Sequence, residues 1–82
     1  MKTNKRQRVA EHMLQWHGGM GSGLYALGSH WHGGHEVTRD VVDRAIAEID
    51  SVIRKEVPFP ETISAADIRE LEGLKKKIMR LA

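Results

Sequence analysis

The sequence contains no cysteine, which excludes disulfide bridges and metal sites with thiolate ligands. It has no run near the roughly 18 consecutive apolar residues that a membrane-spanning helix needs, and its first residues lack the apolar segment of a signal peptide. These absences predict a cytoplasmic protein with no membrane-bound part. Because a chain of 82 residues buries only about 60–65% of its unfolded surface, we expect one helical domain over residues 1–82, with a thin core.

Glycine, histidine and tryptophan are distributed very unevenly. Residues 16–36 hold seven of the eight glycines, four of the five histidines and both tryptophans. The segments on either side follow ordinary amphipathic helical patterns. We therefore expect the features particular to this protein to lie in or against residues 16–36.

The flanking patterns predict an all-α fold, a small bundle of three main helices over residues 4–17, 38–56 and 64–81. The middle segment has the clearest repeat, with apolar residues every three or four positions: Val42, Ile46, Ile49 and Ile53. Each segment starts at or beside a residue type that favours helix N-caps: Asn4, Thr38 and Ser64. Two prolines, Pro58 and Pro60, separate the last two helices, because each forces the preceding residue out of the α region.

Between the first two of these helices we expect a glycine- and histidine-rich connector that carries only a short helical turn near residues 22–31. Four of residues 18–23 are glycines, and each glycine loses additional backbone entropy when it is ordered. Ser22 can cap one or two turns of helix. Gly18 and Gly19 supply the conformation that ends the first helix.

The preferred functional hypothesis is a small, non-enzymatic protein-binding or adaptor module. Tryptophan, tyrosine and methionine are common interface anchors, and the candidate anchors are Trp16, Met20, Tyr25, Trp31 and Phe59. Large apolar residues at helical spacing more often form the core of the protein. The core and interface interpretations are compatible, because one part of the apolar surface can form the core and the remainder can form an interface.

Two further apolar features bear on the same hypothesis. Phe59 stands between two prolines, and we expect it to fill an edge of the core, with a role as a partner anchor as the alternative. The last helix has apolar residues at the spacing of a coiled-coil seam, Leu71, Leu74, Ile78 and Leu81. This seam predicts a homodimer through the C-terminal helix.

Two basic runs support an alternative, a small helix-turn-helix-like protein that binds nucleic acid. The cations that could reach phosphates are Lys2, Lys5, Arg6, Arg8, Arg39, Arg44, Lys75, Lys76 and Lys77. Against this alternative, the connector before residue 38 is longer than the usual turn of the motif. The second helix would also present Asp40, Asp43 and Asp50 to an anionic ligand.

A third hypothesis is a metal site formed by His30, His32 and His35, because neutral imidazoles bind zinc, nickel and copper. Their spacing matches no established metal-binding pattern, so the competing interpretation is that they cap helices or face solvent. The chain has neither a nucleophile motif nor the residue order of a phosphate-binding loop. We therefore expect no enzymatic activity and no cofactor.

Overall fold

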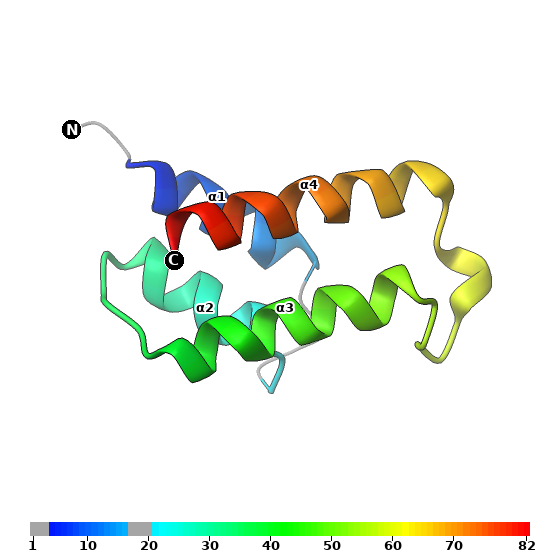
Figure 1. Ribbon diagram of the computed structural model, residues 1–82, viewed down its shortest axis with the longest axis horizontal. Coiled ribbons are helices and arrows are strands. Elements are labelled where there is room, and N and C mark those ends of the chain that lie inside the picture. Colours follow the sequence, from blue (N-terminus) through cyan, green and yellow to red (C-terminus); the bar gives the residue numbers. More distant parts are fainter. Residues whose placement is uncertain (1–3, 17–20) are drawn as a thin grey trace.

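The computed structural model describes residues 4–16 and 21–82 of the chain and contains four α-helices (Figure 1). They are α1 (Lys5–Trp16), α2 (Gly23–His32), α3 (Arg39–Ile53) and α4 (Ala65–Leu81), with a short 3-10 helix, η1 (Pro60–Thr62), before α4. This part of the chain contains no β-strand, so the all-α prediction is confirmed. No helix in it is both long and apolar enough to cross a membrane.

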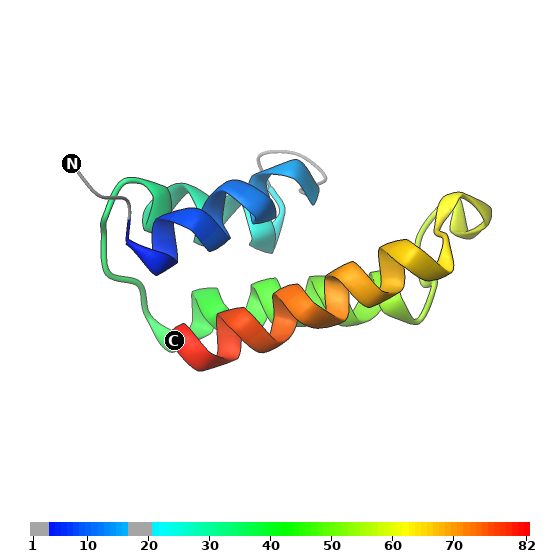
Figure 2. The same ribbon diagram turned by 90° about the horizontal axis from the view of Figure 1, so that it is seen from above.

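The four helices form two antiparallel pairs. The longer pair, α3 and α4, is a hairpin that extends beyond the shorter pair, α1 and α2, which covers one end of it (Figure 2). Around this shared end, α1 packs on α2 and α4, while α3 also packs on α2 and α4. The result is an elongated molecule, with principal extents of 39 × 22 × 19 Å.

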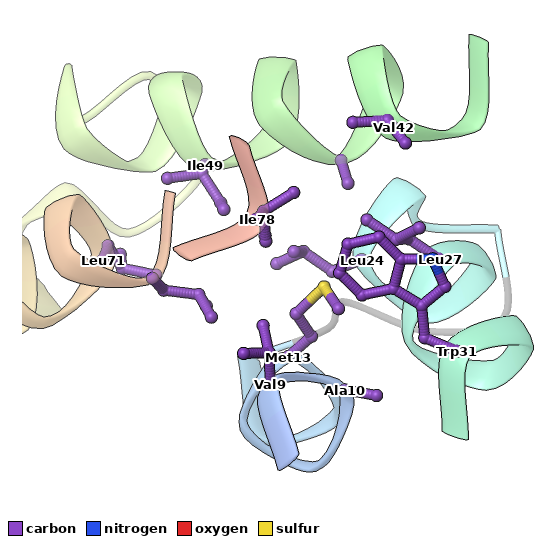
Figure 3. Packing of buried hydrophobic residues seen from close by; sticks show 12 residues of the cluster. Val9, Ala10, Met13, Leu24, Leu27, Trp31, Val42, Ile49, Leu71 and Ile78 are labelled. Atoms are coloured by element: carbon purple, nitrogen blue, oxygen red, sulfur yellow. The ribbon is translucent and has the colours of Figure 1, made fainter. Parts of the chain in front are cut away.

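All four helices contribute equally to one core (Figure 3). Each provides three buried apolar residues: Val9, Ala10, Met13, Leu24, Leu27, Trp31, Val42, Ala45, Ile49, Leu71, Leu74 and Ile78. Full burial of a large apolar side chain contributes roughly 1.5–3 kcal/mol. The three main helices predicted from sequence are therefore too few, because α2 is a ten-residue helix that supplies a quarter of the core.

The helix N-termini follow the predicted caps with one exception. Asn4 Oδ1 accepts from Gln7 N at 2.8 Å while Gln7 Oε1 accepts from Asn4 N at 3.0 Å, so the two residues cap the start of α1 reciprocally. Ser22 and Ser64 accept backbone N–H groups at the starts of α2 and α4, and Ser64 does so in a complete capping box. Thr38 occupies the N-cap position of α3 without a side-chain cap bond.

Two glycines explain how α2 forms a continuous ten-residue helix where only one or two turns were expected. A Cβ at Gly23 would lie 2.7 Å from the backbone carbonyl of Arg44, and a Cβ at Gly28 would lie 3.1 Å from the side chain of Leu14. The glycines therefore let α2 approach α3 and α1 closely. The entropy that these glycines lose on ordering is offset by the close packing of the helices. The number of glycines in the sequence does not show that such packing occurs.

The far end of the α3–α4 hairpin has little core. No residue between Ile49 and Leu71 is buried. Phe59 is 67% exposed, so the expectation that it fills an edge of the core is wrong. The helix α3 also ends earlier than predicted, because Lys55 adopts a left-handed conformation with φ of 60°.

Arg6 joins the ends of α1 and α4. Its Nε and Nη2 donate to the carbonyl oxygen of Leu81 at 3.1 and 2.9 Å, and its guanidinium carbon lies 5.3 Å from the ring centroid of Trp31. Its Nη1 also lies 3.4 Å from the carboxylate of Glu36. Arg6 therefore ties the first turn of α1 to the last turn of α4 and to the core.

Candidate binding groove

A groove runs between α1 and α4 at the end of the molecule where Arg6 joins them. Its lining consists of Lys5, Arg8, Val9, Lys77, Arg80 and Leu81, and its volume is about 400 Å³. We call this feature the α1–α4 groove. Val9 is almost fully buried and Leu81 half-buried, whereas the four cations are exposed. The groove thus has an apolar floor and basic edges.

The edges follow from helical spacing on two antiparallel helices. Lys5 and Arg8 lie three residues apart on α1, and Lys77 and Arg80 lie three residues apart on α4. Residues at this spacing are neighbours on a helix surface, with Cβ atoms about 5–6 Å apart. Each wall of the groove therefore presents two cations one turn apart.

These four cations have no acidic partner in the part of the chain that the structure describes. None of Lys5, Arg8, Lys77 and Arg80 forms an ion pair with a carboxylate in residues 4–16 or 21–82. The basic stretch ends one helical turn beyond Arg8 on α1 and two turns before Lys77 on α4, where Glu70 bonds to His12 and accepts from Trp16 Nε1 at 3.5 Å. The positive potential is thus confined to a short part of the α1–α4 face.

The structure separates the nine cations predicted for nucleic-acid binding. Lys5, Arg8 and Lys77 line the groove. Arg6, Arg39 and Lys75 bond to carboxylates of Glu36, Asp43 and Asp50, the last two at 3.0 and 2.7 Å. Arg44 and Lys76 are exposed elsewhere, on α3 and on the other side of α4, and Lys2 lies outside the described residues.

Sequence reasoning missed Arg80 as a site residue. Its spacing from Lys77 matches that of Arg8 from Lys5, so the signal was present in each helix separately. The pairing of α1 with α4, which brings the two pairs together, depends on the core and could not be read from either basic run.

The five predicted protein-binding residues lie in different environments. Trp31 is only 1% exposed and belongs to the core. Trp16 and Tyr25 are half-buried, on α1 and α2, and Phe59 is exposed near the tip of the α3–α4 hairpin. Met20 lies outside the described residues. Of this set, Trp16 connects α1 with α4, because its Nε1 donates to Glu70.

The structure does not bring His30, His32 and His35 together as metal ligands. His30 Nδ1 donates to the carbonyl of Ala26 at 2.7 Å, and its ring meets His35 edge to face with centroids 6.5 Å apart. His32 lies on a different side of α2, with its Nε2 4.0 Å from a carboxylate oxygen of Glu11. Within the described part of the chain, no three histidine or acidic side chains are placed to hold one ion.

Comparison with protein-family models, curated proteins and solved structures finds no significant match to this chain. The geometry of the α1–α4 groove is therefore the basis on which a function can be proposed.

Proposed function

We propose that this chain is a non-enzymatic binding protein whose partner is another protein, held at the α1–α4 groove. The observation that carries the proposal is the combination of an apolar floor with four exposed cations that have no acidic partner within residues 4–16 and 21–82. Protein interfaces commonly have an apolar centre and a polar rim. Charges at the rim select complementary partners and accelerate their association.

The surroundings of the groove support the same function. Trp16 is half-buried on α1, two turns beyond Arg8 and past His12, and offers an aromatic surface further along the side of α1 that faces α4. Tryptophan and arginine are the residue types most often responsible for binding energy at interfaces. Trp16 therefore remains a candidate protein-binding residue, whereas the groove cations take the place of the buried Trp31.

Nucleic acid is the second candidate, because four cations that pair with no described carboxylate could contact phosphates. The basic stretch is short, however, and ends at Glu70. The helix expected to enter a DNA groove, α3, carries exposed Asp40 and Asp43, and its Arg39 is bonded to Asp43. These features make a protein partner the better match.

Leu71, Leu74 and Ile78 of the predicted dimer seam are buried in the core, so that seam is not available to a second copy. The homodimer through the C-terminal helix is therefore proposed for a different face of α4. There, a shallow hollow between α3 and α4 includes Ile53 and Met79, which is 58% exposed. The same hollow contains acidic Glu72 and basic Lys76. A twofold interface must be complementary to itself, which this mixed face allows and the uniformly basic groove does not. Light scattering at increasing concentration tests the dimer, and a constant monomer mass contradicts it.

Photo-cross-linking from two adjacent positions tests the proposed function. A photoreactive residue replaces Lys77 in the groove or, as a matched control, Lys76 on the other side of α4. In cells that naturally express the chain, we expect a nuclease-resistant protein adduct from position 77 that is absent from position 76. An adduct of the chain with itself at position 76 would report the dimer.

The other outcomes contradict the proposal in distinct ways. A nuclease-sensitive adduct at position 77 would establish the nucleic-acid alternative. Equal adducts at both positions would show nonspecific contact, and no adduct at position 77 would remove the groove as a binding site.

A further inference from the structure

Resting on the proposed function, we infer that the partner enters the α1–α4 groove as an acidic amphipathic helix. Its apolar side chains lie on the floor formed by Val9 and Leu81. Its carboxylates lie along both edges, next to Lys5 and Arg8 on one side and Lys77 and Arg80 on the other.

The two edges determine the charge of this helix. Because each wall carries two cations one turn apart, a partner helix with acids three or four residues apart along each flank can pair with both walls. No carboxylate of the described chain competes for these cations. Because the side chains of these cations are long and exposed, they can reorient toward the partner's carboxylates without a change in the backbone.

The floor determines the apolar part of the helix. The groove exposes more apolar than polar surface despite the four cations on its two edges. A hydrated phosphate backbone would leave that surface uncovered, whereas leucine-like side chains would remove it from water and gain free energy in proportion to the area covered. The floor therefore favours a peptide over a nucleic acid.

A helix meets both conditions where an extended segment does not. Successive side chains of a strand point to two opposite faces, so a strand over the floor would direct one set toward the protein and the other toward solvent. A helix distributes side chains around its axis and can present an apolar stripe with an acidic stripe on each side. Binding of such a helix in a groove is a recurrent mode of peptide recognition.

The test uses designed peptides of about 15 residues, roughly four helical turns. The first peptide has leucines along one stripe and glutamates on both flanks. The second replaces the leucines with serine at the same charge, and the third replaces the glutamates with glutamine. Fluorescence anisotropy measures the affinity of each for the full chain, with a short mixed-sequence DNA duplex as a fourth probe. Circular dichroism reports whether the bound peptide is helical.

We expect the leucine–glutamate peptide to bind as a helix. Either peptide substitution should weaken binding by about tenfold or more, because each removes one of the two required contacts. The doubly substituted chain Lys77→Glu/Arg80→Glu should lose about tenfold or more in affinity for it. The control Lys76→Glu, with the same type of charge change on another face of α4, should alter affinity less than about twofold.

Several results would overturn the inference. Equal binding of the serine peptide would show that charge alone is recognised, and binding of the peptide without helix formation would exclude the proposed occupant. Binding of the DNA but not the peptide would favour nucleic acid. If no peptide binds while the photoreactive residue at position 77 still cross-links to a protein, the inference fails and the proposed function stands. If both experiments fail, both proposals fall.

Discussion

Replacing Gly23 by alanine tests whether the close approach of α2 to α3 determines the packing of the bundle. Gly23 is the first residue of α2, and its N–H donates to Glu48 Oε2 at 2.7 Å. A Cβ there would meet backbone carbon and oxygen of Arg44 at 2.7 Å, about 0.7 Å inside the ordinary contact distance of 3.4 Å. Backbone atoms cannot rotate away, so α2 must move from α3 and loosen the contacts of Leu24.

The expected magnitude follows from two opposing effects. Overpacking of this kind costs about 1–3 kcal/mol, while replacing glycine in a compatible backbone conformation returns about 0.4–1 kcal/mol by restricting the unfolded chain. We therefore expect Gly23→Ala to destabilise the protein by about 1–2 kcal/mol. For a domain of this size the midpoint of thermal unfolding should fall by about 5–15 °C.

Urea denaturation followed by circular dichroism measures the change, with Gly73→Ala as the matched control. Gly73 lies inside α4, and a Cβ built on it would meet no described atom within 4 Å apart from its chain neighbours and the backbone of its own helix. Alanine there should stabilise the helix by up to about 1 kcal/mol. The two glycine substitutions should thus have opposite signs. If Gly23→Ala is as stable as the unsubstituted chain, the close approach does not constrain the packing.

Three further predictions concern helix ends. Arg6→Gln should lower the free energy of unfolding by about 1–2 kcal/mol in urea titrations, since it removes charged hydrogen bonds to the end of α4 and the contact with an aromatic ring; a change below the error of the titration would contradict this role. Ser64→Ala should cost about 1 kcal/mol through loss of the capping box, whereas Thr38→Ala should cost clearly less because Thr38 makes no cap bond, and equal losses would refute the distinction. Arg54 lowers the pKa of Glu56 below 4.5 through a hydrogen bond and its charge, so this pair stabilises the fold above that pH and ceases to do so as the pH falls through the lowered pKa; carboxyl NMR of Arg54→Gln should show the Glu56 midpoint moving up toward 4.5, and an unchanged midpoint would exclude Arg54 as the cause.

Local patterns in the sequence predicted the helices well where the determining contacts are local. The caps at Asn4, Ser22 and Ser64 involve residues three positions along the chain, and all three form the expected bonds. The start of α3 after Thr38 was also correct. Near the end of that helix, Asp50 accepts from Lys75 of α4 at 2.7 Å, and Arg54 bonds to Glu56.

The contacts between helices could not be predicted in this way. Gly23 and Gly28 look like helix breakers until α3 and α1 lie against them. Phe59 looked like a core residue because it is large and rigidly held, yet the core ends before it. The groove likewise needs two helices far apart in sequence, so its floor and edges become visible only when α1 and α4 are paired.

The thin packing at the far end of the α3–α4 hairpin makes that end less stable than the four-helix end, where the groove lies. Because no side chain between Ile49 and Leu71 is buried, the hairpin tip can open locally at lower free energy than the four-helix end, and its amide hydrogens should exchange with solvent first. The α1–α4 groove lies at the opposite end, near Leu81. The loop around Phe59 is therefore a suitable place to insert a tag or a reporter domain, since an insertion there leaves both the shared core and the groove in place.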